Sequence, residues 1–427
     1  MATIRPFRGL RYAASAGTME ALVAPPYDVL SAAERDEFAG KNQHNVVHLT
    51  LPEQEADDRS KFVKYARSAS RLAQWRQTGA LELDSPSFYR YRQSFSIPGH
   101  DEVLERLALI SLIKTEPYEK GVVLPHEQTF PKHKEDRLRI LEATRAHLEC
   151  IYGLFEDDDQ ALWQMIDQAP AERVQDVTTE DGVRHVVEKV SDPAACAALA
   201  VAMEPKKVWI ADGHHRYETA CTFRAMQGFK SETVAEDFMM MALSSLRDPG
   251  LVLLPTHRIL KSMPLTADDL QDKMSTDFTL TPCANGELYR RIESVSSEGG
   301  RAFGVALPGG RGFVATVRDL EALSAKIDGE GSDLLHRLDV TLLHEIIFAQ
   351  LLGLTGLDFF DYTRDEHEAV AAVESGSPAA FLMNPPTVED MRHIALGGEK
   401  MPQKSTFYYP KILSGLVFWS LSDFVSE

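Results

Sequence analysis

The stretch KVWIADGHHRYETACTFRAMQ, residues 207–227, decides the fold of this part of the chain. Its first residues, KVWIA, combine β-branched and aromatic side chains, which is typical of a strand. Asp212 and Gly213 then lead directly into a run with helical character. The stretch therefore predicts a strand, a tight turn and a helix, in that order.

Such a turn is a natural site for an anion. The first N–H groups of a helix lack intrahelical partners, and the helix dipole adds about half a positive charge at that end. Gly213 allows close backbone approach, while His214, His215 and Arg216 place polar or cationic groups at the opening. We expect Asp212, Gly213, His214, His215 and Arg216 to bind the cofactor. A structural alternative stays open, in which Asp212 caps the helix and the histidines lie on the surface.

Composition excludes several classes of protein. The chain has 427 residues, 44% of them hydrophobic, and 45 basic against 64 acidic side chains give a net charge of −19. This length predicts two or three domains. The acidic charge argues against broad nucleic-acid binding, because that requires a basic surface, although a local basic pocket for phosphate remains compatible with it.

Location follows from what the sequence lacks. The first residues contain no apolar core of the length of a secretory signal, and no run approaches the roughly 18 apolar residues of a membrane span. The four cysteines are scattered without a CxxC pair, so we expect reduced thiols. These features predict a cytoplasmic protein without membrane contact, and they leave a homo-oligomer open.

The remaining pattern predicts an α+β protein with mixed sheets. Turn-forming residues at 97–101 and at Asp181 and Gly182 predict two β-hairpins. Ser31 and Glu34 have the spacing of a capping box at a helix start. Expected helices and strands are mixed along the chain, and we assign it to the α+β class.

Two apolar segments and the domain boundary complete this interpretation. NVVHLTL, residues 45–51, predicts a short strand, and FMMMALSSL, residues 238–246, predicts an apolar helix. We expect one portion over 1–260, which carries the phosphate-binding turn, and a C-terminal α+β portion over 261–427. No flexible linker marks this boundary.

The segment LPHEQTFPKHKEDR, residues 124–137, concentrates groups that phosphoryl transfer needs: a proton acceptor, carboxylates and cations. We expect His126, Glu127 and Asp136 to be catalytic, and Lys134 and Arg137 to bind substrate. The alternative is a solvated charged loop that leads into a helix.

A second candidate segment is GGEKMPQKSTFYYPK, residues 397–411. It is not a Walker A loop, because Gln403 stands where that loop requires glycine. We still expect Lys404, Ser405 and Thr406 to offer a charge and two hydroxyl groups to a phosphate or carboxylate of the substrate. A structural turn near the C-terminus is the alternative.

The residues ADGHHRYETA, 211–220, resemble the nucleotide-binding signature of the ParB/sulfiredoxin superfamily, with Gly213, His215 and Arg216 matching. Sulfiredoxins carry their catalytic cysteine where His214 stands here, so sulfinic-acid chemistry does not carry over. Free serine kinases belong to the same superfamily. The resemblance therefore implies a ParB/sulfiredoxin-like portion and a small-molecule phosphoryl transferase acting on serine or phosphoserine.

A wider resemblance covers nearly the whole chain, which is similar to the uncharacterised bacterial and archaeal family called domain of unknown function 1015. The matching stretches are APPYDVL (24–30), HEQT (126–129), KEDR (134–137), ADGHHRYETA (211–220), LPTHR (254–258) and MPQKSTFYYPK (401–411). Together they are specific. This family implies relatedness more than activity.

These observations favour a phosphoryl-transfer enzyme of small-molecule metabolism that binds ATP or ADP with Mg, in either the kinase or the phosphatase direction. Its partners would be a nucleotide or a small phosphorylated metabolite. The sequence carries no zinc signature and leaves the metal unknown. The alternative is a nucleotide-sensing regulatory protein without turnover.

Overall fold

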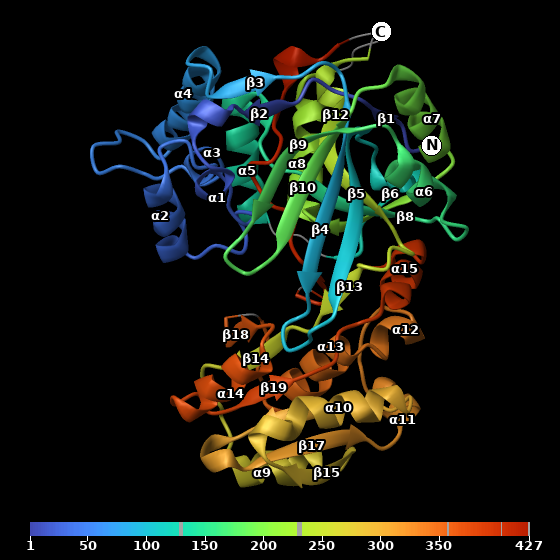
Figure 1. The fold of residues 1–427 in the computed structure, drawn as a ribbon. Helices are drawn as coiled ribbons and strands as arrows, with labels where there is room; N and C mark the ends of the chain where they lie inside the picture. The colour runs from blue at the N-terminus through green and yellow to red at the C-terminus, as the bar shows by residue number, and fades with distance from the viewer. Residues whose placement is uncertain (128–130, 229–232, 357, 403, 426–427) are drawn as a thin grey trace. The chain divides into compact units, whose positions relative to one another are not determined.

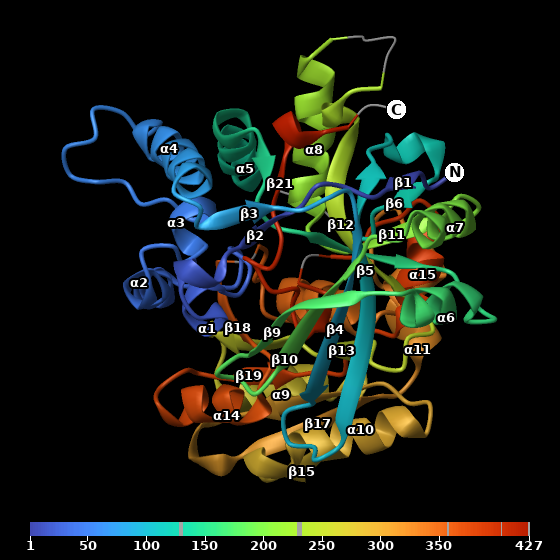
Figure 2. The same cartoon turned by 45° about the horizontal axis from the view of Figure 1, so that its top comes forward.

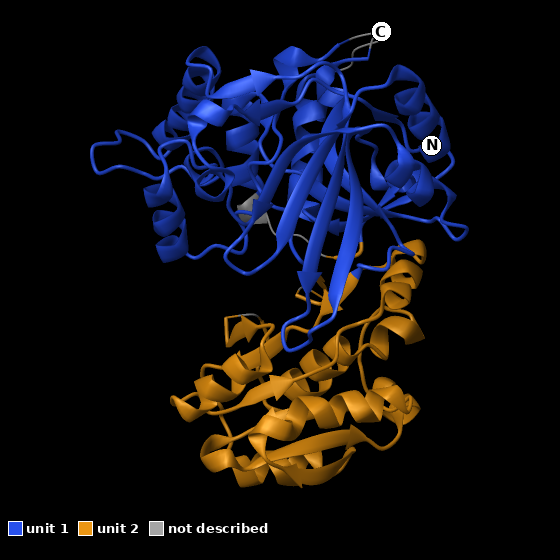
Figure 3. Cartoon of the chain, in the orientation of Figure 1, with its two compact units in different colours: residues 1–125, 129–251, 410–427 blue, residues 126–128, 252–409 orange. Residues whose placement is uncertain are grey.

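The computed structural model describes residues 1–127, 131–228, 233–356, 358–402 and 404–425; of residues 131–133 it describes the backbone. The chain divides into two compact units (Figure 3). Unit 1 comprises Met1–Pro125, Thr129–Leu251 and Pro410–Glu427. Unit 2 comprises His126–Gln128 and Val252–Tyr409. Residues 126–128 thus belong to unit 2, although the stretches on both sides of them belong to unit 1. At residue 410 the chain returns from unit 2 to unit 1.

Unit 1 is built on a mixed sheet of nine strands in its described part, in the order β6-β11-β8-β12-β5-β4-β10-β9, with β1 added beside β5. The strands are β1 (Ile4–Arg5), β4 (Phe88–Ser96), β5 (Val103–Lys114), β6 (Val123–Leu124), β8 (Ile151–Phe155), β9 (Glu172–Thr178), β10 (Arg184–Val190), β11 (Val208–Asp212) and β12 (Phe238–Ser245). The pairs β6/β11 and β8/β12 are parallel, while β11 runs antiparallel to β8. Two smaller pairs join β2 (Leu10–Tyr12) to β3 (Leu81–Leu83) and β7 (Ala146–His147) to β21 (Trp419–Ser420).

Helices surround this sheet. They are η1 (Ala14–Ala16), α1 (Met19–Leu22), α2 (Ala32–Lys41), α3 (Val47–Thr50), α4 (Val63–Gln77), η2 (Tyr118–Lys120), α5 (Pro131–Thr144), α6 (Ala161–Gln168), α7 (Pro193–Met203), α8 (His214–Met226), η3 (Ala235–Asp237) and η7 (Leu421–Asp423). Helix α5 packs between α4 and α8 (Figures 1 and 2). This packing brings residues of α5 to the beginning of α8.

Two apolar clusters stabilise unit 1. The larger one packs α6, α7 and α8 against the sheet and includes Ile151, Ile210 and Tyr217, all fully or almost fully buried. The other lies among α3, α4 and the β2/β3 pair and includes Trp75 and Phe418. Burying side chains of this size contributes about 1.5–3 kcal/mol each.

Unit 2 has a six-stranded sheet in its described part, in the order β15-β17-β16-β19-β14-β18. These strands are β14 (His257–Leu260), β15 (Phe278–Cys283), β16 (Ala302–Ala306), β17 (Gly312–Val317), β18 (Phe360–Thr363) and β19 (Ala380–Leu382), and β13 (Val252–Leu254) pairs separately with β20 (Phe407–Tyr409). The helices are α9 (Ala267–Met274), η4 (Asn285–Glu287), α10 (Leu288–Ser297), η5 (Pro308–Gly310), α11 (Leu320–Ser324), α12 (Asp333–His336), α13 (Asp339–Thr341), the π-helix η6 (Leu342–Leu351), α14 (Glu366–Glu374) and α15 (Val388–Leu396). Helices α10 and α14 pack on this sheet over a core that includes Leu288, Ile292 and Ala369.

The α+β class with mixed sheets, expected from the sequence, is confirmed. Both predicted hairpins are present, as β4/β5 and β9/β10 (Figure 1). The capping box is present too, because Ser31 Oγ accepts from Glu34 N and the Glu34 carboxylate accepts from Ser31 N at 2.8 Å. Among the described residues, no helix combines the length and apolar character that a membrane span requires.

Two predicted elements are wrong. Within the segment 238–246, residues Phe238–Ser245 form strand β12, not a helix, because this apolar run lies inside the sheet between β5 and β8 and all the strand's residues are buried. Residues 45–51 form the short helix α3, not a strand. Here the Asn45 side chain accepts from Val47 N at 3.1 Å and donates to the carbonyl of Ala21 at 2.9 Å, which favours a turn over an extended chain.

Candidate functional site

The turn between β11 and α8 is close-packed and requires glycine. Gly213 is the N-cap residue of α8 and has φ = 95°. A Cβ atom at this position would lie 2.6 Å from Cγ2 of Ile151, in the neighbouring strand β8. Because both the backbone angle and the space exclude a side chain, helix α8 begins directly against the sheet.

Asp212 lies at the end of β11 and does not cap the helix. Its Oδ2 atom lies 3.4 Å from Nζ of Lys411 and 3.8 Å from Nη2 of Arg216. Burial raises the cost of ionisation, but these two cations outweigh it and lower the pKa of Asp212. Asp212 is therefore an ionised link between the C-terminal segment and α8.

Arg216 extends from the first turn of α8 into the interior of unit 1. Its Nη1 donates to the Cys150 carbonyl oxygen at 2.8 Å, and its side chain is 10% exposed. Its Nε has no hydrogen-bond partner. Although burial opposes the charge, Glu149, Asp28 and Asp212 raise the pKa of Arg216. Arg216 is thus a charged side chain with one donor to spare.

Arg137 reaches the same region from α5. Its Nη1 donates to the Thr50 carbonyl oxygen at 2.8 Å and lies 3.8 Å from Oε2 of Glu149. Its Nε also has no partner, and its side chain is 7% exposed. The Tyr27 ring lies near both guanidinium groups, at 4.0 Å from that of Arg137 and 5.6 Å from that of Arg216. Burial raises the pKa of Tyr27, so its hydroxyl stays protonated.

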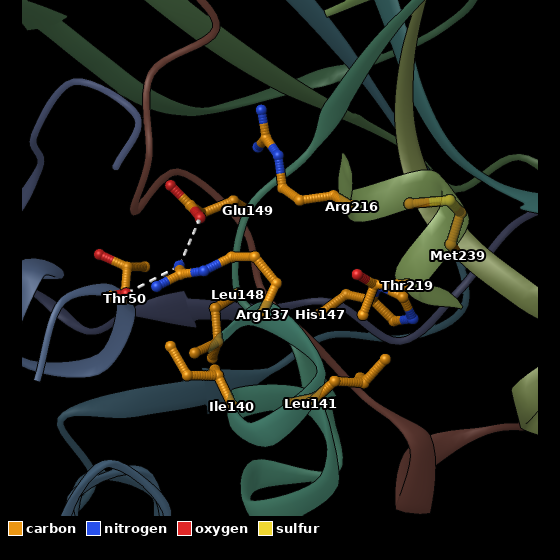
Figure 4. Close-up of a pocket in the computed structure, with 11 residues that line it drawn as sticks. Thr50, Arg137, Ile140, Leu141, His147, Leu148, Glu149, Arg216, Thr219 and Met239 are labelled. Carbon is orange, nitrogen blue, oxygen red and sulfur yellow. Dashed lines mark hydrogen bonds and ion pairs between the residues drawn. The ribbon is translucent and has the colours of Figure 1, made fainter. Parts of the chain in front are cut away.

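A cavity of about 50 Å³ lies among these groups (Figure 4). It is lined by Arg137, Glu149, Arg216 and Thr219, together with apolar side chains. Besides the two arginine Nε atoms, Oγ1 of Thr219 lacks a partner, although Thr219 is only 3% exposed. Buried donors in proteins are almost always hydrogen-bonded, so these three atoms are candidates to bind a polar group in the cavity. The cavity has room for a few water-sized groups, well below the roughly 300–1,000 Å³ of a ligand pocket.

Glu149 is the acidic group of this cavity. Figure 4 shows its carboxylate pointing toward Arg137. Its Oε1 accepts from Tyr27 N at 3.2 Å and from Ser414 Oγ at 2.9 Å. Neutral donors therefore hold Glu149 in addition to Arg137. The lining residues of the cavity include two guanidinium groups and one carboxylate.

The two other predicted residues of α5 are engaged in ion pairs. Asp136 accepts from Tyr65 Oη at 2.7 Å and from Lys64 Nζ at 3.1 Å, and it pairs with Arg137. Although burial opposes ionisation, Arg137 and these donors lower the pKa of Asp136 to about 2. This environment suits the positioning of Arg137 better than proton acceptance at neutral pH. Lys134 forms an ion pair with Glu218 of α8.

The predicted residues His126, Glu127, Lys404, Ser405 and Thr406 meet each other in unit 2. The predicted residues His214, which is buried, and His215, which is half-buried, lie in the first turn of α8 in unit 1. Nε2 of His126 lies 2.8 Å from Oγ1 of Thr406, and His126 is fully buried. Lys404 N donates to Glu127 Oε1 at 2.7 Å, while Lys404 itself has φ = 57°, an unusual value for a residue with a side chain. Ser405 is buried, and its hydroxyl donates to the Pro402 carbonyl. The two segments that the sequence singled out thus hold one another in place.

Arg258 of β14 joins this second group. It is fully buried, and its Nη2 donates to the Lys404 carbonyl at 3.1 Å while its Nε lies 3.2 Å from Nε2 of His344, in the π-helix η6. Burial lowers the pKa of Arg258 to about 10 and that of His344 to about 3. The LPTHR segment is therefore positioned beside the C-terminal segment. The guanidinium group of Arg258 mainly donates to backbone carbonyls and to neutral His344.

The candidate residues consequently form two groups, one in each unit. The predictions identified Arg137, Arg216 and Asp212 in unit 1 but not Glu149, Thr219 or Lys411 as site residues. Lys411 had a signal, since it ends the segment 397–411. No sequence pattern marked Glu149 or Thr219, because a single polar residue in an apolar stretch does not indicate that it will line a cavity. Among the described residues, no group of three His, Cys, Asp or Glu side chains could hold a metal ion.

The chain is similar to known proteins in sequence and in structure. A family model described as "Protein of unknown function (DUF1015)" matches residues 4–341. No curated protein matches the chain. Among solved structures, a mutant free serine kinase in complex with ADP is similar at 14% identity, over 73% of this chain and 92% of that one, with a TM-score of 0.36.

Two further solved structures are similar at the same level. A conserved hypothetical protein from Pyrococcus furiosus is 15% identical over 74% of this chain and 97% of that one, with a TM-score of 0.36. SbnI with a C-terminal truncation, from Staphylococcus aureus, is 9% identical over 73% of this chain and 88% of that one, with a TM-score of 0.37.

Proposed function

This chain belongs to the DUF1015 family, and on that premise we propose that it is a phosphoryl-transfer enzyme of small-molecule metabolism, whose phosphate-binding site is the cavity at the start of α8. One observation carries the proposal: Arg137, Arg216 and Thr219 line one small cavity, and Nε of both arginines and Oγ1 of Thr219 have no hydrogen-bond partner among the described protein atoms. These are donors of the kind that bind phosphate oxygens.

The size and position of the cavity support a phosphate group rather than a whole nucleotide as its occupant. A volume of about 50 Å³ excludes a base and a ribose. The cavity adjoins the first turn of α8, where the helix dipole favours negative charge. Arg137 and Arg216 would hold the phosphate, and the rest of the ligand would extend out of the cavity.

ATP or ADP with Mg remains the proposed cofactor. The described side chains offer no three-ligand metal cluster. Mg²⁺ is often bound mainly by phosphate oxygens and water, with one or two carboxylates, so this donor set is compatible with it. When bound, the ion would neutralise charge on the transferred phosphoryl group. The protein's own contribution is the pair of arginine charges and the exclusion of water around them.

Glu127 is the proposed proton acceptor, as the sequence predicted. His126 is a positioning residue in this proposal, because its ring is buried against Thr406. Asp136 is likewise a positioning residue for Arg137. By the resemblance of residues 211–220, serine or phosphoserine is the proposed substrate, in either direction.

Calorimetry tests the binding step. We expect ATP, ADP, CTP or phosphoserine, each with magnesium, to release heat on binding to the wild-type protein. The Arg216→Ala variant should bind the same ligand at least tenfold more weakly. Arg184→Ala is the matched control, since Arg184 is half-exposed and pairs with Asp176 on the sheet surface. Equal binding by both arginine variants, or no binding by the wild type, would end the proposal.

A sensor without turnover is the second candidate function. Its support comes from two side chains. Burial lowers the pKa of His147, which lines the cavity, to about 4, and the pKa of Asp136 is lowered to about 2. Neither side chain is therefore a proton acceptor suited to neutral pH. Phosphorus NMR with nucleotide and a panel of amino acids separates the two functions, because only an enzyme forms new phosphorylated species. An enzyme should lose this turnover in Glu127→Gln while keeping its binding heat.

A further inference from the structure

A second, larger cavity of about 450 Å³ lies in unit 1 and is not part of the site described above. Its walls come from residues 20–30, helix α2, the tip of the β9/β10 hairpin and residues 410–413. This volume is within the range of small-molecule pockets, roughly 300–1,000 Å³. The cavity can therefore accept an organic ligand, which the smaller one cannot.

The walls of this larger cavity are largely apolar. They include Pro25, Val29, Leu30, Phe38 and Leu413. The one histidine among its lining residues, His185, is buried, and its ring nitrogens are engaged by Tyr91 Oη at 2.6 Å and Thr179 Oγ1 at 3.2 Å. The interior thus favours a hydrocarbon or ring portion of a ligand and offers it few hydrogen bonds.

The charged groups of the cavity are mainly acidic. Five carboxylates line it, from Glu20, Glu34, Glu37, Glu180 and Asp181, and all five residues are exposed. Two lysines oppose them. Lys41 lies 2.8 Å from Glu180 and 3.8 Å from Glu37, and Lys411 is paired with Asp212. The net charge of these groups is 2 − 5 = −3, which attracts a cation and repels a free anion.

From the apolar walls and this excess of negative charge, we infer that the cavity binds a small molecule that carries an apolar portion and a protonated amine. The apolar portion contacts the walls, and the ammonium group lies at the carboxylates beside α2 and the hairpin tip. Lys411 lines this cavity and also pairs with Asp212. The inference concerns binding only and does not depend on the proposed phosphoryl transfer.

Phenethylamine and its uncharged counterpart 2-phenylethanol are the probes, measured by calorimetry or ligand-observed NMR with the full-length protein. Both contain the same apolar portion, so their difference reports the ammonium group. The test variant is Glu37→Gln combined with Glu180→Gln, which leaves Lys41 without its two carboxylates. The matched control is Glu105→Gln combined with Glu172→Gln, because these exposed carboxylates pair with Arg92 and Lys189 outside the cavity.

We expect the wild type and the matched control to bind phenethylamine about fivefold more tightly than 2-phenylethanol. The test variant should lose this preference and still bind 2-phenylethanol, which shows that it is folded. Val29→Trp should weaken both probes by filling the cavity. Absence of phenethylamine binding, an unchanged preference in the test variant, or unchanged binding in Val29→Trp would each overturn the inference.

Arg216→Ala separates this inference from the proposed function. That variant should lose affinity for phosphorylated ligands and keep its affinity for phenethylamine. If the wild type binds phenethylamine but no phosphorylated ligand, the proposed function fails and the inference stands. If it binds phosphorylated ligands through Arg216 but shows no preference for the amine, the inference alone fails.

Discussion

Nζ of Lys411 lies 3.4 Å from Oδ2 of Asp212, so the C-terminal segment of unit 1 is joined to the residue that precedes the turn at Gly213. Both side chains are largely buried, with 15% and 17% exposure. The same carboxylate lies 3.8 Å from Arg216. One acidic group thus sets the position of two cations that line different cavities.

Removing one partner of this ion pair should destabilise unit 1. We expect Lys411→Met to lower the free energy of unfolding by about 2 kcal/mol, because it leaves a buried carboxylate with only the more distant Arg216. Urea denaturation measures the change. The control is Lys261→Met, whose partner Asp361 is 65% exposed, and its effect should stay below about 0.5 kcal/mol. Equal effects in the two variants would show that the Asp212 pair is not a buried one.

The turn itself can be tested at Gly213. We expect Gly213→Ala to destabilise the protein by about 3 kcal/mol, since the new methyl group adds a clash with Ile151 to the backbone strain at φ = 95°. Gly182→Ala is the matched control, because its φ is 80° but the space around it is open. Thermal and urea unfolding should therefore show a larger loss of stability in Gly213→Ala than in Gly182→Ala, and the difference measures the clash with Ile151. A smaller cost of Gly213→Ala in an Ile151→Ala background than in the wild type would confirm that contact.

The lowered pKa of Asp136 predicts a dependence of stability on pH. Since its folded pKa of about 2 lies below the unfolded value, its contribution is complete above about pH 4 and disappears as the pH falls toward 2. The side chain is 34% exposed, so after allowance for solvent screening we expect about 1 kcal/mol.

Urea unfolding of the wild type and Asp136→Asn at pH 5 and pH 2.5 tests this expectation. The variant should be less stable at pH 5, and the difference should shrink at pH 2.5. Tyr65→Phe removes one of the hydrogen bonds to Asp136 and should show a smaller effect of the same sign. A difference that does not change with pH would contradict an ionised, stabilising Asp136.

In unit 2, His126 and Thr406 should be energetically coupled. We expect His126→Gln and Thr406→Val each to cost about 1–2 kcal/mol, with a coupling energy of about 1 kcal/mol in a double-mutant cycle, because the two side chains share one partly buried hydrogen bond. His100→Gln, on an exposed loop, is the control and should be neutral within about 0.5 kcal/mol. Additive effects would mean that the two residues act independently.

The local sequence pattern predicted the structure correctly where a few neighbouring residues determine it. The capping box at Ser31 and the hairpin at Asp181 and Gly182 depend on residues a few positions apart, and both are present. Pattern failed at residues 238–246, because an unbroken apolar run suits either a buried helix or a central strand. Its position between β5 and β8 decides the matter, and that position is not a local property.

By itself, the sequence determined the strand, turn and helix at 207–227, because a β-rich run, a glycine and a helical pattern act within a few residues of each other. Only the tertiary structure decided which distant side chains share a site. Arg137 lines the same cavity as Arg216 because α5 packs between α4 and α8, and Lys411 reaches Asp212 through the return of the chain to unit 1. The residues of the small cavity are likewise brought together by packing, since Arg137 comes from α5 and Arg216 and Thr219 come from α8.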